Sequence, residues 1–172
     1  MNLILISALW GIVMMFSGLI IKSRSAAKTV ALIGAVVLLA GSLFDLAGKM
    51  IIDNNFNGML LYDRFGLLFL VVIVFALLIY FLLNGKEIEK VGNHPYEYFA
   101  LIFFVMCGVG LVTLFNNLLI LFLGIEIISI PLYILTGADK RNLKSNEAAL
   151  KYFLMGSFST GIMLMGIAFL YG

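Results

Sequence analysis

Residues 98–136 read YFALIFFVMCGVGLVTLFNNLLILFLGIEIISIPLYILT. This stretch contains a single charged side chain, Glu126, and a polar pair, Asn116-Asn117, near its middle. Each half is close to the ~20 residues that an α-helix needs to cross a bilayer core. The asparagine pair is typical of a tight turn. We therefore predict two consecutive transmembrane helices here, at residues 98–115 and 118–136.

The rest of the chain has the same character. Of its 172 residues, 63% are hydrophobic and 12% are charged, whereas soluble domains carry about 25% charged residues. A globule of this size cannot bury so much apolar surface, so its solvent is the lipid bilayer. This composition argues against a soluble enzyme, a disulfide scaffold and a nucleic-acid-binding protein. We predict an all-α integral membrane protein with one transmembrane domain of six helices, at residues 3–21, 29–46, 66–83, 98–115, 118–136 and 148–171.

Basic residues predict the orientation of these helices. If all six cross the membrane, one face receives eight basic residues and the other only Lys49 and Arg64. Short loops rich in Lys and Arg stay in the cytoplasm. We therefore expect loops one, three and five to be cytoplasmic and both termini to lie on the non-cytoplasmic side. The eight residues are Lys22, Arg24, Lys28, Lys86, Lys90, Lys140, Arg141 and Lys144.

A short segment between the second and third spans has a different pattern. Residues 50–62 read MIIDNNFNGMLLY, too short to cross a membrane. Their apolar residues flank Asn57-Gly58, a pair that favours hairpin turns. We expect a small β-hairpin on the non-cytoplasmic side.

Glu126 is the strongest candidate for a functional residue. It lies near the middle of the fifth span among apolar neighbours. A charged residue at the centre of a membrane helix costs about 2.5 to 3.5 kcal/mol on insertion scales, so such residues usually face a partner or a water-filled path. Burial disfavours the ionised form of a carboxyl group, and a nearby cation favours it. We expect a proton-exchange site, with a neutral acid that only packs against another helix as the alternative.

Polar residues continue from Glu126 along one face of the same helix. Helical spacing aligns Ser129, Tyr133 and Thr136 with it, in a stripe that leads to the predicted cytoplasmic end. Pro131 lies within the stripe and frees a backbone carbonyl group. The pattern predicts a half-path for protons with a helix kink at the proline.

Lys151 is the second candidate for proton transfer. It opens the sixth span and lies about 8 Å from Glu126 in depth, if each helix rises about 1.5 Å per residue. A lysine at this position can tune the proton affinity of the acid. Alternatively, Glu147 and Lys151 form an interfacial i, i+4 pair.

Three further features favour structural roles. Asp45 and Lys49 repeat the i, i+4 pattern, and we expect both to reach the membrane interface. Small residues at 156, 157, 160 and 161 favour close helix packing. His94 stands alone in a polar loop, and no cluster of metal ligands accompanies it. We expect no metal and no cofactor in this chain.

Two blocks of sequence resemble a known family. Residues 123–133 read LGIEIISIPLY, and residues 147–153 read EAALKYF, with Gly156 following. These blocks resemble the antiporter-like membrane subunits, in particular subunit N of the proton-pumping NADH:quinone oxidoreductase, respiratory complex I. Weaker similarity extends back through residues 97–101, EYFAL, to residues 63–66, DRFG.

The resemblance implies a membrane-arm subunit that moves protons while other subunits oxidise NADH and reduce quinone. Flavin, iron–sulfur clusters and quinone then belong to those other membrane-arm and peripheral-arm subunits. Glu126 matches the functional glutamate of the family's fifth helix, and Lys151 matches the lysine that opens the sixth. The family's lysines on later helices have no counterpart here, so we expect an N-terminal part of a longer subunit, or one half of a split subunit.

Two other functions remain open from the sequence. A subunit of a cation/proton antiporter or of a membrane-bound hydrogenase would use similar helices. A non-catalytic membrane scaffold would need Glu126 only for packing.

Overall fold

The computed structural model describes residues 2–20, 24–48, 58–84 and 95–171. Within these residues the chain forms six α-helices, each long and apolar enough to cross a membrane. The prediction of an all-helical protein with six spans is therefore confirmed. The helices are α1 (Asn2–Ile20), α2 (Arg24–Leu46), α3 (Arg64–Asn84), α4 (Pro95–Thr113), α5 (Leu118–Thr136) and α6 (Leu143–Tyr171).

Three of these helices begin three or more residues before the apolar runs that predicted them. Helix α6 begins five residues early because Asn142 caps it, with its Oδ1 accepting a hydrogen bond of 3.0 Å from the Lys144 amide. Helix α4 begins at Pro95, a residue favoured in the first helical turn. Helix α2 begins at Arg24, ahead of the run that starts at Thr29. Hydropathy locates the lipid-embedded part of a helix, and these polar first turns extend beyond it.

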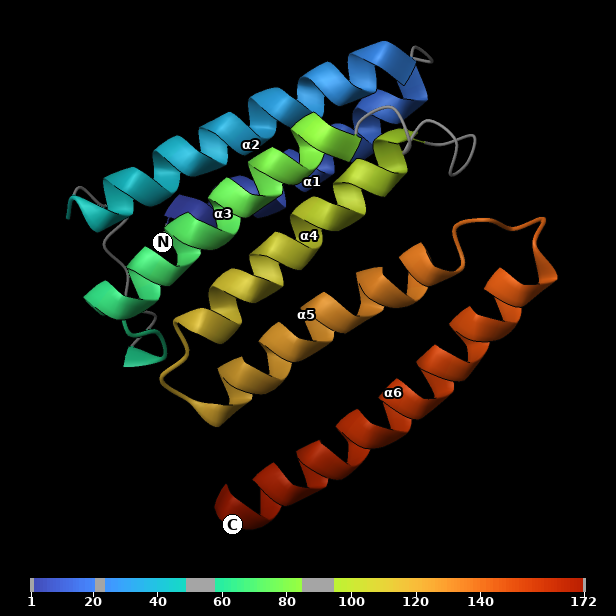
Figure 1. Ribbon diagram of the computed structural model, residues 1–172. Coiled ribbons are helices and arrows are strands. Elements are labelled where there is room, and N and C mark those ends of the chain that lie inside the picture. Colours follow the sequence, from blue (N-terminus) through green and yellow to red (C-terminus); the bar gives the residue numbers. More distant parts are fainter. Residues whose placement is uncertain (1, 21–23, 49–57, 85–94, 172) are drawn as a thin grey trace.

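The six helices form a bundle in which α4 occupies a central place. Helix α4 packs closely against α1 and α5 and also touches α2 and α3. Helix α6 lies at the edge of the bundle and packs on α5 (Figure 1). The chain therefore divides into a compact group, α1 to α4, and an outer α5–α6 hairpin that is joined to it through α4.

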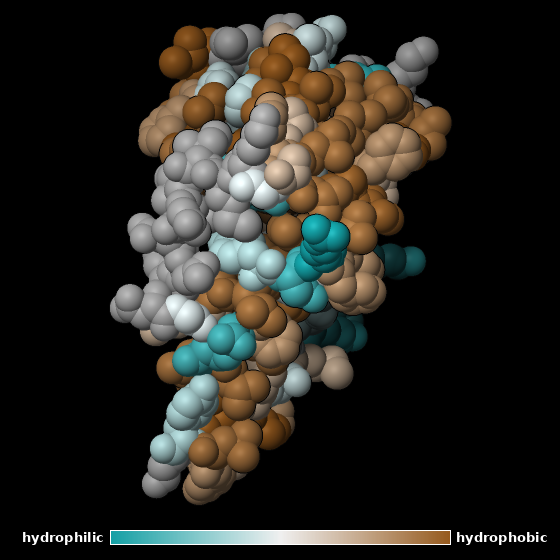
Figure 2. All heavy atoms as spheres, turned by 90° about the vertical axis from the view of Figure 1, so that its left-hand side faces the viewer, coloured by the Kyte–Doolittle hydropathy of each residue, from teal (hydrophilic) through white to brown (hydrophobic). Residues whose placement is uncertain are grey.

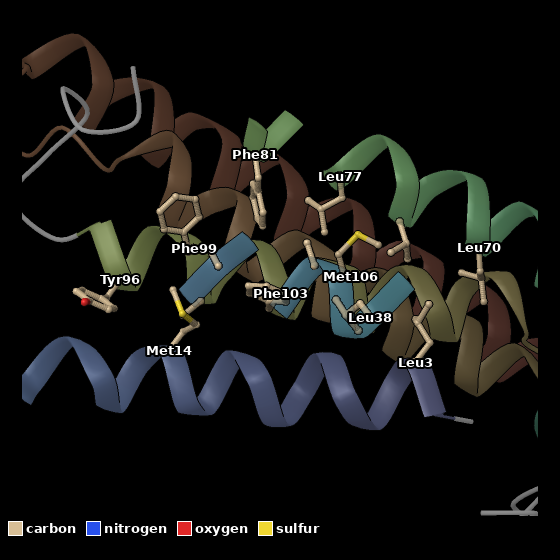
Figure 3. Close-up of a cluster of buried hydrophobic side chains, with 14 of the residues drawn as sticks. Leu3, Met14, Leu38, Leu70, Leu77, Phe81, Tyr96, Phe99, Phe103 and Met106 are labelled. Atoms are coloured by element: carbon tan, nitrogen blue, oxygen red, sulfur yellow. The ribbon is translucent and has the colours of Figure 1, made fainter. Parts of the chain in front are cut away.

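Aromatic side chains fill the centre of the compact group. Phe81 of α3 meets Phe99 and Phe103 of α4 edge to face, with ring centroids 5.1 Å and 5.9 Å apart. Met14 of α1 approaches the same cluster from the other side (Figure 3). Edge-to-face pairs of this kind add about 0.5 to 1.5 kcal/mol to the burial of the rings. This core packs α4 against α1 and α3, and α4 in turn packs against α5.

The outer surface is strongly apolar. Leu19, Phe65 and Phe169, for example, are each more than 70% exposed. Such a surface is typical of contact with lipid or with another membrane helix, and not of contact with water. Figure 2 looks onto the end of the bundle where α1 begins, α2 ends and α3 begins, and hydrophilic residues lie there among predominantly hydrophobic ones.

The segment before α3 pairs with the turn between α4 and α5. Leu60 and Phe115 form an isolated antiparallel bridge, and the Leu61 amide donates to the Leu114 carbonyl at 2.8 Å. Residues 50–57 of the predicted hairpin at residues 50–62 lie outside the described residues, and the described part of it contains no strand. Gly58 has the positive φ, 81°, expected at its turn. The hairpin itself stays a prediction.

Candidate functional site

Helix α5 is fixed at its beginning and along its contact with α4. The Asn117 side chain caps it by accepting a hydrogen bond of 2.8 Å from the Leu119 amide. Gly108 of α4 lies so close to Gly124 and Ile128 of α5 that a side chain there would meet their backbone atoms. Contact through glycine is the usual way in which membrane helices approach closely. Gly124 and Ile128 thus mark the side of α5 that faces α4.

Glu126 lies on the opposite side of α5. It is two residues from Gly124 and two from Ile128, and two steps of about 100° turn a side chain to the other side of a helix. Its side chain is half-buried. Ten residues separate it from the end of α5, about 15 Å along the axis. The described part of the chain contains no hydrogen bond or ion pair to the Glu126 carboxyl group.

Two hydroxyl groups of the predicted stripe bond to their own helix. Ser129 Oγ donates to the Ile125 carbonyl at 2.7 Å, and Thr136 Oγ1 donates to the Leu132 carbonyl at 2.8 Å. Each hydroxyl group donates its proton to the backbone carbonyl four residues earlier. The hydroxyl group is thereby hydrogen-bonded within the helix, as lipid offers it no partner. Their oxygen atoms keep acceptor capacity. The stripe exists, but its hydroxyl groups do not form a hydrogen-bonded chain with one another.

Tyr133, the third member of the stripe, is enclosed by α6. It is 8% exposed. Its ring meets Tyr152 and Phe153 edge to face, with centroids 4.8 Å and 5.7 Å apart, and its hydroxyl end lies against Gly156. The prediction that small residues of α6 allow close packing is confirmed at Gly156, and the partner is Tyr133. The Tyr133 ring therefore fills the space between α5 and α6, at a level between Glu126 and the end of α5 at Thr136.

Pro131 is buried inside α5, which continues through it as one helix from Leu118 to Thr136. Proline has no amide hydrogen, so the carbonyl of Ile127 loses its usual helical partner. This carbonyl lies one residue from Glu126 and adds an acceptor to the neighbourhood of the acid.

The structure does not bring Lys151 to Glu126. Lys151 Nζ is 2.6 Å from Glu147 Oε1, and both side chains are mostly exposed, at 69% and 63%. This is the geometry of the interfacial i, i+4 pair that the sequence left open as the alternative. Among the described residues, Glu126 and Lys151 share no contact.

Asp45 differs from the expectation for it. We predicted that it reaches the membrane interface beside Lys49, but Asp45 is only 3% exposed, and Lys49 lies outside the described residues. Asp45 Oδ2 accepts a hydrogen bond of 3.3 Å from the Leu3 amide, in the first turn of α1. A carboxylate at a helix N-terminus is stabilised by the free amides and the helix dipole. Sequence patterns do not reveal this contact, because it joins the start of α1 to the end of α2, 42 positions further along the chain.

Tyr62 lies next to this acid, between Gly58 and the start of α3. Its hydroxyl group is buried and has no hydrogen-bond partner among the described residues. Burial, and secondarily the negative charge of Asp45, raises the pKa of Tyr62 to about 12. The phenol is therefore neutral at physiological pH.

Within the described residues, no three His, Cys, Asp or Glu side chains are grouped so that they could hold a metal ion.

Comparison with known proteins assigns a class to this arrangement. The family described as "NADH:quinone oxidoreductase/Mrp antiporter, TM" matches residues 115–172, which contain Glu126 and the whole α5–α6 hairpin. This part of the chain, about a third of its length, is therefore similar to the antiporter-like membrane proteins.

Individual relatives narrow this class. The chain is 36% identical to NADH-quinone oxidoreductase subunit N of Flavobacterium psychrophilum over 175 residues, covering 99% of the chain and 36% of the relative. It is 32% identical to subunit N of Magnetococcus marinus, covering 100% of the chain and 34% of that protein. The chain is thus similar over nearly its whole length to NADH-quinone oxidoreductase subunit N, and it spans about a third of the length of these relatives.

A solved structure supports the same relationship. The chain matches part of respiratory complex I from Thermus thermophilus, a structure with bound aureothin, with a TM-score of 0.77 and 25% sequence identity. The match covers 99% of this chain and 36% of that chain. The arrangement of all six helices is thus one that occurs within a respiratory complex.

Proposed function

We propose that this chain is part of the proton-translocating membrane arm of an NADH:quinone oxidoreductase, with Glu126 as its proton acceptor. The observation that carries the proposal is the half-buried carboxyl group at mid-span, which has no hydrogen-bond partner among the described residues. Placing an ionisable group within the membrane costs free energy, and ionisable residues found there usually have a function. The relatives are named as subunits of NADH-quinone oxidoreductase, and this name is the basis for the reaction proposed here.

In this proposal the chain carries no redox chemistry. NADH oxidation, flavin, iron–sulfur clusters and quinone reduction belong to other membrane-arm and peripheral-arm subunits. A change in charge or hydration, transmitted along the membrane arm, alters the proton affinity of Glu126. Ser129, the carbonyl freed by Pro131, and Thr136 supply acceptors toward one membrane face, and Tyr133 separates Glu126 from that face. Lys151 is a surface charge paired with Glu147.

We further propose the context of the chain. It is the N-terminal portion of a longer subunit, because its relatives are about three times as long. It lies in a bacterial plasma membrane with both termini on the non-cytoplasmic side. Lys140 and Arg141 between α5 and α6, and Lys144 in the first turn of α6, are all exposed and support a cytoplasmic position for that loop. The hairpin at residues 50–62 then lies outside.

The test is Glu126→Gln in the complete membrane complex reconstituted into vesicles. Glutamine keeps the size of the side chain but cannot carry a proton, so NADH-driven proton transfer falls while the abundance of the complex stays normal. Glu97→Gln is the matched control, because Glu97 is exposed in the first turn of α4. Normal pumping in Glu126→Gln, at normal abundance, would refute the role of Glu126 and favour the scaffold.

A second candidate is a subunit of a cation/proton antiporter. The family description includes the Mrp antiporter, and this favours it over the hydrogenase alternative. Purification of the native particle separates the two. The oxidoreductase predicts NADH dehydrogenase activity in the same particle, whereas the antiporter predicts sodium-dependent proton flux without NADH.

A further inference from the structure

Helices α5 and α6 run antiparallel (Figure 1), and hydrogen bonds join them near both ends. Near the loop, Ser145 Oγ donates to the Thr136 carbonyl at 2.7 Å. At the far end, Tyr171 Oη donates to Asn117 Oδ1 at 2.9 Å. These contacts, with the packing of Tyr133 between them, fix how far one helix is shifted along the other.

The shift determines which part of α6 is level with Glu126. Both helices rise about 1.5 Å per residue. Glu126 lies nine residues after Asn117, and nine residues before Tyr171 is Ile162. From the other end, Glu126 lies eleven residues before Gly137, which is closest to Ala149, and eleven residues after Ala149 is Thr160. The level of Glu126 on α6 is therefore residues 160–162.

Thr160 is the residue of this level that faces α5. It is half-buried, whereas Gly161 and Ile162 are exposed. It also continues the face of Gly156, which touches Tyr133, because the two are four residues apart. Glu126 lies on the side of α5 away from α4, and so does Tyr133, two turns further on. Glu126 and Thr160 thus lie at the same depth on facing sides of two packed helices.

The two side chains are chemically suited to act together. Thr160 Oγ1 donates to the Ser157 carbonyl at 3.2 Å, and its oxygen retains lone pairs for a further hydrogen bond. It makes no direct hydrogen bond with Glu126, so a hydrogen-bonded link between these two side chains requires a bridging water. A water that bridges two polar groups is nearly as favourable as a direct hydrogen bond.

We propose that Thr160 is a positioning residue for Glu126. Its hydroxyl group, through one bridging water, holds the carboxyl group in the orientation in which it exchanges its proton. The inference rests on the proposed role of Glu126 and adds to it a residue on α6.

The test compares Thr160→Val with Ser159→Ala in the complete complex in vesicles. Valine keeps the shape of threonine but lacks the hydroxyl group. Ser159 is the adjacent residue and is exposed, so it controls for loss of a hydroxyl at the same depth. Two quantities are measured: NADH-driven proton transfer, and the infrared carbonyl band of protonated Glu126, identified as the band that Glu126→Gln removes.

We expect Thr160→Val to move that band to higher frequency, because the carboxyl group loses a hydrogen bond. Proton transfer falls about two- to tenfold, the range that corresponds to one hydrogen bond. Thr160→Ser restores both quantities, and Ser159→Ala leaves both unchanged. If the valine variant does not assemble, Thr160→Ala serves for the same comparison.

An unchanged band and unchanged proton transfer without the Thr160 hydroxyl would overturn this inference while leaving Glu126 in its role. The absence of any Glu126 band in the wild-type protein would instead remove the proposed function, and this inference with it.

Discussion

The hydroxyl end of Tyr133 occupies the space that a side chain at position 156 would fill. Gly156 therefore lets α6 approach α5 at the level where Tyr152 and Phe153 also meet the Tyr133 ring. Because α6 packs on α5, this contact is central to its position. It also keeps Tyr133 between Glu126 and the loop end of the hairpin.

We expect Gly156→Ala to loosen the α5–α6 hairpin. The added methyl group would collide with the Tyr133 ring, and overpacking of this kind costs about 1 to 3 kcal/mol. Gly161→Ala is the control, because nothing lies within 4 Å of the added methyl group there. Thermal unfolding of the detergent-purified protein measures the difference. Equal unfolding temperatures for the two variants would show that Tyr133 adjusts without cost.

Lys151→Met should have little effect on proton transfer. Its ammonium group is exposed and paired with Glu147, and exposed ion pairs contribute about 0 to 1 kcal/mol. Methionine keeps the apolar stem of the side chain. Initial rates of NADH-driven acidification in vesicles compare this variant with Glu126→Gln. A loss as large as that of Glu126→Gln would instead assign Lys151 to the proton path.

Tyr62 should resist ionisation at alkaline pH. Burial, and then the charge of Asp45, raises its pKa from about 10 to about 12, so the folded protein holds the phenolic proton more tightly than the unfolded chain does. The resulting stabilisation is complete below pH 10 and is lost as the pH rises toward 12.

The phenolate absorbance of the folded protein, with that of Tyr62→Phe subtracted, measures this titration. Asp45→Asn should lower the midpoint only in part, since burial is the larger cause. A midpoint near 10 in the wild-type protein would contradict the buried position of the Tyr62 hydroxyl.

Much of the fold could be predicted from hydropathy. The apolar runs located all six helices, and Asn116-Asn117 correctly divided α4 from α5. Hydropathy does not reveal the early start of α6 because residues 144–147 are polar, although the capping residue Asn142 signals it. Hydropathy reports lipid contact and not the full length of a helix.

The site was only partly predictable. A lone charge in an apolar run identified Glu126, and helical spacing aligned Tyr133 with it. The enclosure of Tyr133 and the burial of Asp45 could not be predicted, because each depends on a contact with another helix. The periodicity of one helix does not specify which neighbour covers it.

The central claim is that Glu126 gains and loses a proton during turnover. Infrared difference spectroscopy of the wild-type complex, before and during NADH oxidation, tests it directly, with Glu126→Gln to identify the carboxyl band. The account predicts that this band appears and disappears with turnover and is absent from the variant. A Glu126 band that stays constant while the wild-type complex pumps protons would contradict the account.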